Sequence, residues 1–160
     1  MWPPTGRATS PTARPPWALL VEAGAEVNGR FGGANHDETP LHWAASSDDV
    51  EVLDALVDLG ADIEAPGAVI AGGTPLTDAR AFGQWRAAHR LVERGARTTI
   101  DDAATLGLQD RPEGYFAGTA PAPDDVSRAC RGACHGGQRR CAEHLLDGAP
   151  TPTGSRPGSR

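Results

Sequence analysis

The sequence predicts an all-α fold in which helix–turn–helix units stack into a solenoid, with degenerate terminal repeats and disordered ends. Short sequence motifs that recur at a constant spacing predict this fold. The triplet Thr-Pro-Leu stands at residues 39–41 and returns at residues 74–76, a spacing of 35. A Gly-Ala pair begins at residues 24, 60 and 95, and a Leu-Val pair begins four residues before each of these glycines. A period of this length is typical of repeat proteins whose units bury their apolar faces on one another.

The first helix of each unit is predicted from its cap and its apolar stripe. Thr39 is a favourable residue just before a helix, and Pro40 suits the first helical position, where no amide donor is needed. Leu41, Ala44 and Ala45 then stand at i, i+3 and i+4, which places them on one face of the helix. The small alanines allow a neighbouring helix to approach closely.

A second helix is predicted over residues 49–59, because its valines and leucines recur at helical spacing. Gly60 follows and is expected to end that helix in a left-handed conformation. The next unit repeats the arrangement with helices at residues 74–81 and 85–94 and a final Gly95. Each unit is therefore a helix, a short turn, a second helix and a glycine stop.

At this point the chain resembles the ankyrin repeat family over residues 17–97. Residues 39–45, TPLHWAA, fit the T-P-L-H-x-A signature. The second unit departs from it at Thr77, in the place of the histidine, and at Arg80, in the place of the second alanine. The resemblance implies a non-catalytic scaffold for protein–protein interaction. Its structural motif positions here are Thr39, Pro40, Leu41, His42, Gly60, Thr74, Pro75, Leu76 and Gly95.

Two further units are predicted in degenerate form after residue 97. Ala103, Ala104 and Gly107 keep the phase of a fourth unit. Pro112 falls inside its expected second helix, where a proline costs about 3 kcal/mol. The predicted organisation is a disordered segment at 1–16, an ankyrin-repeat domain at 17–149 and a disordered tail at 150–160. Within the domain we expect a half repeat at 17–28, full repeats at 29–64 and 65–97, and degenerate repeats at 98–118 and 126–149, with a break over residues 118–125.

Neither end of the array carries a capping repeat with a polar outer face. We therefore expect apolar side chains to lie partly exposed at Leu19, Leu20 and Val21 at one end and at Leu145 and Leu146 at the other. An array open at both ends has little stability of its own. A non-functional fragment, or one that folds only on its partner, is the alternative to an autonomous scaffold.

Composition and charge exclude several classes of function. The net charge of −6 argues against a nucleic-acid binder, which needs a basic face. No run of 18 apolar residues is present, so no membrane span is predicted. The first residues lack the apolar stretch of a secretory signal and the three cysteines are an odd number, so we expect a cytoplasmic protein. Charge is banded along the chain, with a net −10 over residues 22–64 and +3 over residues 77–97.

The resemblance implies that a partner protein binds to the loop tips and the inner helices. Carried over position by position, the partner-binding residues are Asp37, Glu38, Ser46, Ser47, Asp48, Ala81 and Phe82. Phe82 is the best single anchor, because an exposed aromatic side chain contributes strongly to interfaces; the alternative is that its ring folds back onto Trp85. The acidic first band favours a partner with a basic surface.

Two features near the first unit leave alternatives open. Residues 29–38 form a longer loop than the unit needs, which is either a recognition finger holding Arg30, Phe31 and His36 or a tolerated surface insertion. His42 is expected to serve structure: in the family this residue bonds the backbone and the capping threonine. No base, nucleophile and orienting group cluster in the sequence, so we expect neither an enzyme nor a cofactor.

One cluster has the chemistry of metal ligands. Cys130 and Cys134 stand at i, i+4, and Cys141 and His144 stand at i, i+3, so four side chains are available for a tetrahedral zinc site or a small redox module. Against this, the repeat phase places Cys130 and Cys134 at core positions, where cysteine behaves as a small apolar residue. We therefore predict no metal site and keep zinc as the alternative. The adjoining stretch at residues 135–140 is predicted to be the turn between the last two helices.

Overall fold

The computed structural model describes residues 16–32, 37–108 and 122–148, and within these ranges the chain is mostly helical. The helices are α1 (Pro16–Glu22), α2 (Pro40–Ser46), α3 (Val50–Asp58), α4 (Pro75–Ala81), α5 (Trp85–Glu93), α6 (Ile100–Leu106), α8 (Pro123–His135) and α9 (Arg139–Gly148). A short antiparallel ribbon joins β1 (Phe31–Gly32) to β2 (Asp37–Glu38), with Phe31 opposite Glu38.

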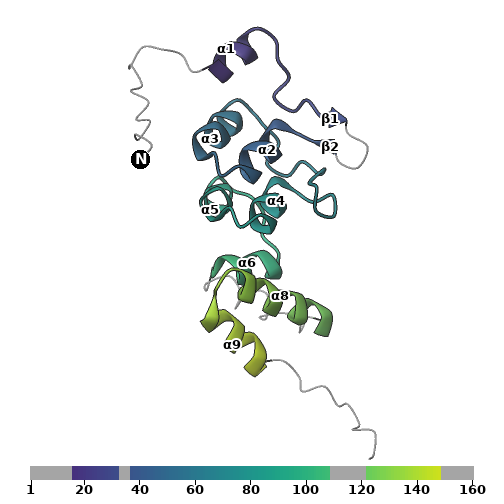
Figure 1. Ribbon diagram of the computed structural model, residues 1–160, viewed down its shortest axis with the longest axis vertical. Helices are drawn as coiled ribbons and strands as arrows, with labels where there is room; N and C mark the ends of the chain where they lie inside the picture. Colours follow the sequence, from purple (N-terminus) through teal and green to yellow (C-terminus); the bar gives the residue numbers. More distant parts are fainter. Residues whose placement is uncertain (1–15, 33–36, 109–121, 149–160) are drawn as a thin grey trace, which may run out of the picture.

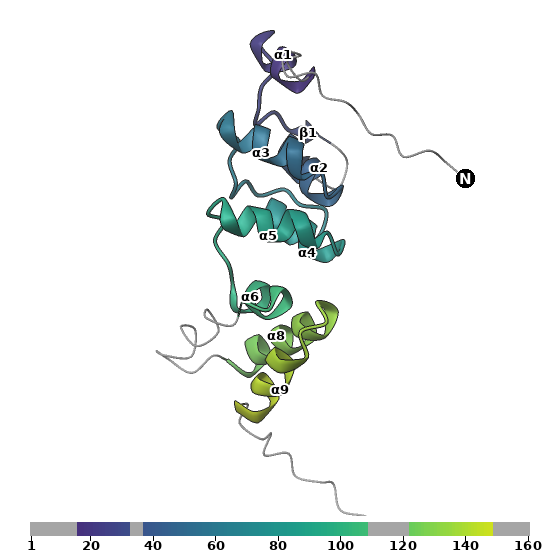
Figure 2. The same ribbon diagram turned by 90° about the vertical axis from the view of Figure 1, so that its left-hand side faces the viewer.

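The helices are arranged as an elongated column, with α1 at one end and α9 at the other (Figure 1). Helices α2 and α3 form one pair and α4 and α5 the next, and the view in Figure 2 shows these pairs lying above one another. Contacts run from α2 to α4, from α3 to α5, from α4 to α6 and from α6 to α8. No helix in the described ranges is long and apolar enough to cross a lipid bilayer.

The helices predicted for the two complete units are present at the expected residues. The break expected over residues 118–125 is too long, because α8 already begins at Pro123, which occupies the first turn of the helix. The turn predicted at residues 135–140 is confirmed between α8 and α9, where Gly137 has a φ of 68°. The predictions for Pro112 and His36 and for most of both chain ends lie outside the described residues.

Three helices begin with the same capping arrangement but with different partners. The Thr39 amide donates to Nδ1 of His42 over 3.1 Å, and the Thr74 amide donates to the Thr77 hydroxyl over 3.3 Å. The Thr99 amide donates to an Asp102 carboxylate oxygen over 2.8 Å. Each helix start is therefore satisfied locally, whichever acceptor stands at the third helical position.

Glycine ends the outer helices as predicted. Gly60 and Gly95 have φ values of 91° and 101°, which only glycine adopts at little cost. The Gly60 amide donates to the Val57 carbonyl, and the next amide, that of Ala61, donates to the Leu56 carbonyl over 2.9 Å. This pair of bonds satisfies carbonyl groups that the last turn of the helix would otherwise leave unpaired.

Two apolar clusters form the core. The first joins α2 to α5 and contains Leu41, Leu53, Leu76 and Leu91, all fully buried, together with several alanines. The second joins α6, α8 and α9 through Ala104, Val126, Ala129, Ala133, Cys141 and Leu145. The expectation of exposed chain ends is confirmed for Leu19, Leu20 and Leu146 but is wrong for Leu145, which is 2% exposed because α9 turns it onto α8.

The charge bands of the first two full units meet where the outer helices stack. Arg90 of α5 donates to Asp54 of α3 over 2.7 Å, and Arg94 pairs with both Asp54 and Asp58. The hydrogen bond from Arg90 lowers the pKa of Asp54 below its ordinary value. Much of the acidic band is therefore neutralised by the next unit, and its charge contributes to stacking.

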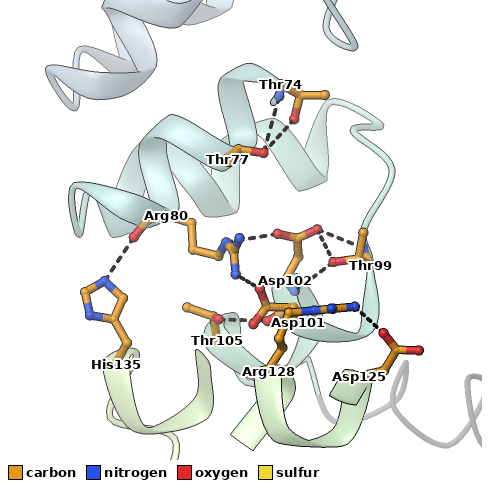
Figure 3. A network of polar contacts seen from close by, with 10 residues as sticks. All are labelled: Thr74, Thr77, Arg80, Thr99, Asp101, Asp102, Thr105, Asp125, Arg128 and His135. Atoms are coloured by element: carbon orange, nitrogen blue, oxygen red, sulfur yellow. Dashed lines mark hydrogen bonds and ion pairs between the residues drawn. The ribbon is translucent and has the colours of Figure 1, made fainter. Parts of the chain in front are cut away.

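Arg80 connects the two clusters (Figure 3). Its guanidinium pairs with Asp101 and lies 3.1 Å from an Asp102 oxygen, both on α6. Its carbonyl group lies 3.1 Å from Nε2 of His135 at the end of α8. On the α8 side, Gly136 allows the close approach, since a Cβ there would overlap the Thr105 carbonyl. The side chain that departs from the repeat signature thus ties α4 to α6.

Asp78 is a buried carboxyl group at the start of the second unit. Its side chain is 0% exposed and faces Glu38, and neither of its oxygens completes a hydrogen bond of normal geometry with a described residue. Burial, with the nearby Glu38 carboxyl, raises the pKa of Asp78 to about 6. The carboxylate therefore weakens the fold near neutral pH.

We expect Arg80→Ala to lower the free energy of unfolding by about 2–3 kcal/mol, because it leaves the nearly buried Asp102 carboxylate without its counter-ion. Urea titration followed by far-UV circular dichroism measures this loss. Arg139→Ala is the control: Arg139 is 88% exposed and, among the described residues, pairs with Glu143 of its own helix, so a change within about 0.5 kcal/mol is expected. Equal small losses in both variants would contradict the role of Arg80.

We expect Asp78→Asn to stabilise the chain at pH 7 by about 1–3 kcal/mol. The folded-state pKa of Asp78 lies above the unfolded value near 3.9, so the folded chain binds this proton more tightly. The destabilisation is present above pH 6 and disappears as the pH falls through about 6 towards 4. The difference between the variant and the wild type in urea titrations should therefore shrink from pH 7 to pH 5. A variant less stable than the wild type at pH 7 would contradict this, and the exposed Glu51→Gln serves as the control.

Candidate functional site

The residues predicted to contact a partner lie mainly at the C-terminal ends of α2 and α4. Ser47, Ala81 and Phe82 are exposed there, and the ring of Phe82 is 49% exposed. The alternative prediction is that the Phe82 ring packs on Trp85. The ring of Trp85 lies edge-on to that of His135, with ring centroids 5.4 Å apart. Asp37 is also exposed, on β2.

Three of the predicted surface residues are committed to the interior or to neighbouring units. Glu38 is 3% exposed, so the expectation that its side chain faces a partner is wrong: β2 turns it inward towards Asp78. Asp48 accepts a hydrogen bond from the Ala87 amide over 2.8 Å and so joins the first unit to α5. The Ser46 carbonyl accepts a hydrogen bond from Gln84 of the next unit over 2.9 Å, and the Ser46 hydroxyl donates to the Trp43 carbonyl of its own helix.

His42 is fully buried between two loops. Nδ1 lies 2.9 Å from the Thr39 hydroxyl, and Nε2 lies 3.4 Å from the Gly73 carbonyl of the next unit. Burial lowers the pKa of His42, so the ring is neutral at pH 7. This geometry agrees with the structural role implied by the ankyrin resemblance.

The loop before the first unit is fastened by one arginine. Nη1 of Arg30 donates to the Asp37 carbonyl over 3.0 Å, to its carboxylate over 2.9 Å and to the Pro66 carbonyl over 2.8 Å. Phe31 is 62% exposed and packs edge-on against Trp43, with ring centroids 6.4 Å apart. Arg30 therefore ties the residues before β1 to β2 and to Pro66, and Phe31 is exposed beside it.

A cleft of about 260 Å³ lies beside Ala81, and the sequence analysis did not identify it. Arg80, Arg128, Arg131 and His135 line it, with Asp101 and Thr105 at its base on α6. Arg80 is paired with Asp101 and Arg128 is paired with Asp125, whereas Arg131 is exposed. Phe82, which is exposed, follows the cleft-lining residue Ala81 directly in the sequence. The sequence signal for the cleft was Arg80, which stands where the repeat has alanine.

The cysteines of α8 and α9 do not gather as the zinc alternative requires. Cys141 is buried, Cys130 is half-buried and Cys134 is exposed. The expectation that Cys134 occupies a core position is wrong, because Ala129 and Ala133 fill the α8 core. Burial raises the pKa of both Cys130 and Cys141, which disfavours their thiolate forms. Among the described residues, His144 included, no three His, Cys, Asp or Glu side chains could hold a metal ion.

Comparison with known proteins identifies the first complete unit. The family model of the ankyrin repeat matches residues 36–68. The chain is also similar to palmitoyltransferase AKR1 of Kluyveromyces lactis, with 54% identity over 43 residues. That stretch is 27% of this chain and 6% of the relative, so the chain spans only a small part of the relative. The chain therefore contains an ankyrin repeat at residues 36–68.

Proposed function

We propose that the protein is a non-catalytic scaffold that binds another protein through the ends of its inner helices. In this proposal the helix pairs from α2 to α9 form one ankyrin solenoid, with the last two units degenerate. The observation that carries the proposal is Phe82, a 49% exposed aromatic side chain next to a cleft lined by arginine. Aromatic and arginine side chains are the types most enriched among the residues that dominate binding energy.

Contacts between neighbouring units hold this surface in a fixed arrangement. Asp48 bonds the backbone of α5, Arg80 bonds two residues of α6, and His135 bonds the backbone of α4. These contacts pass from one unit to the next, so the helix ends hold fixed positions relative to one another. A preorganised surface loses less conformational entropy when a partner binds.

The chemistry of the surface describes the partner. Phe82 offers contact to an apolar side chain, and the exposed guanidinium of Arg131 offers a bidentate bond to a carboxylate. Exposed acidic residues of the first unit, Glu51 and Asp62 among them, favour a basic region of the partner near α3. The predicted preference for a basic surface therefore applies to the N-terminal part of the column rather than to the cleft.

The relative with a transferase name does not alter this proposal. The matched stretch is 6% of that protein, and no palmitoyl transfer is proposed for this chain. The alternative of a non-functional or partner-dependent fragment stays open, and the zinc alternative has no cluster among the described residues to support it. Cytoplasmic localisation is part of the proposal, as the place where such a partner would be met.

We expect Phe82→Asp and Arg131→Glu each to weaken binding of a partner by about tenfold or more, because each removes an anchor and places a repulsive charge at the same site. The experiment compares proteins retained by immobilised wild type with those retained by each variant, by quantitative mass spectrometry. A protein lost from both variants is then titrated by calorimetry against the purified chains.

His89→Glu is the matched control, because His89 is exposed on α5, an outer helix. It should retain the same proteins as the wild type. All three chains should show unchanged circular dichroism, which separates loss of contact from loss of fold. Retention by Phe82→Asp and Arg131→Glu at the wild-type level would contradict the proposed surface.

A further inference from the structure

An apolar groove of about 530 Å³ opens at the other end of the column, beside α1. Leu20 and Val21 of α1 form one wall, and Trp43 and Ala44 of α2 with Leu56 of α3 form the other. The exposed ring of Phe31 packs against Trp43 and extends the apolar surface. The groove is separate from the cleft beside Phe82, which lies at the end of α4.

The repeat itself shows what belongs in this groove. Thirty-five residues separate equivalent positions in the first two full units, so Pro40, Trp43 and Ala44 of α2 correspond to Pro75, Asp78 and Ala79 of α4. Pro75, Asp78 and Ala79 are almost completely buried, because α4 packs beneath α2. On α2 the same face is only partly covered: Trp43 is 50% exposed and Pro40 is half-buried, whereas Ala44 is 5% exposed.

The groove therefore occupies the position in which α2 stands relative to α4. An inner helix placed there would lie beside α1 as α2 lies beside α3. Asn28 holds the segment after α1 in register with the next unit, because its amide group bonds the Gly60 carbonyl and the Asp62 amide. The outer position is thus already filled, and a single helix completes the pair.

The charges around the groove indicate the chemistry of that helix. The charged side chains that line it are Glu26 and Asp49, both acidic, and the exposed Glu51 follows on α3. No cation lines this groove in the described part of the chain. A helix with an apolar stripe and basic flanks would bury the open face and meet opposite charge at both edges.

A second copy of the chain fits less well. Its exposed end is the pair α8 and α9, which carries arginine side chains and one exposed leucine, Leu146. Stacking that pair onto the groove would require α9 to take the outer position that α1 already holds. A lone helix needs no such displacement.

We propose that this groove binds a basic amphipathic helix of another protein, in the position that an inner helix occupies in the complete repeats. The bound helix covers Trp43 and Leu20 with its apolar stripe and places its basic side chains against Glu26 and Asp49. This surface lies beyond the one proposed for general partner binding, and either can fail without the other.

The test uses the full chain and a fluorescent synthetic peptide of about 16 residues, with Leu and Ala at i, i+3, i+4 and i+7 and Arg on both flanks. A second peptide carries Glu in place of each Arg. Fluorescence anisotropy should give saturable binding of the basic peptide and at least about tenfold weaker binding of the acidic one.

Leu20→Arg places a cation and a longer side chain on the wall of the groove. It should weaken binding of the basic peptide by about tenfold or more. Leu20 is 62% exposed, so the substitution does not disturb the core. Leu146→Arg is the matched control at the opposite end, where the leucine is 64% exposed, and it should bind the peptide as the wild type does. Phe82→Asp should also leave this binding unchanged, which separates the groove from the cleft.

Several results would overturn the proposal. These are the absence of saturable binding, equal binding of the two peptides, and equal loss in Leu20→Arg and Leu146→Arg. Sedimentation velocity tests for self-association. If the wild type self-associates and Leu20→Arg is monomeric, the groove binds a second copy of the chain instead. Absence of binding to the intact chain, restored in a Trp2→Ala variant, would assign it to the chain's own first residues.

Discussion

Arg80 joins two apolar clusters that would otherwise meet only along α6. Its guanidinium reaches the carboxylates of Asp101 and Asp102, and its backbone carbonyl meets His135 of α8. The ankyrin signature places alanine here, and an alanine side chain could not form the ion pairs that Arg80 makes with α6. The charge replaces apolar contact at the point where the repeat degenerates. The cleft lined by Arg128 and Arg131 exists because this junction is polar and is not filled by side chains.

The helices were predictable from the sequence because their determinants are local. In the two complete units a threonine, a proline and a small apolar stripe start the inner helix and a glycine ends the outer one, so no knowledge of the neighbours is required. Arg80 was visible as a departure, but its partners stand in the following unit, and pairing across units depends on how far apart the helices settle. The spacing of residues along the chain does not give the distance between stacked helices.

Burial of charged residues was the other property that the sequence did not reveal. Glu38 and Asp78 belong to different units and stand 40 residues apart in the sequence, yet the ribbon and the stacked helices enclose both. Asp48 was assigned to the surface by analogy with the repeat, but its carboxylate is used on the Ala87 amide. The sequence does not distinguish an acidic residue of a loop tip that is exposed to solvent from one that bonds to the next unit.

The surfaces proposed to bind partners are the helix faces that stacking leaves uncovered. Between α3 and α5 some acidic and basic side chains pair, so Asp54 and Arg90 are engaged with each other although both are charged and lie on outer helices. Where a unit lacks a neighbour, the same faces stay open: Trp43 is half exposed while its counterpart Asp78 is fully buried. In a repeat column, therefore, a residue's capacity to bind depends less on its type than on whether another unit covers it. At the end beside α1, an apolar face and the acidic side chains of Glu26 and Asp49 occur together.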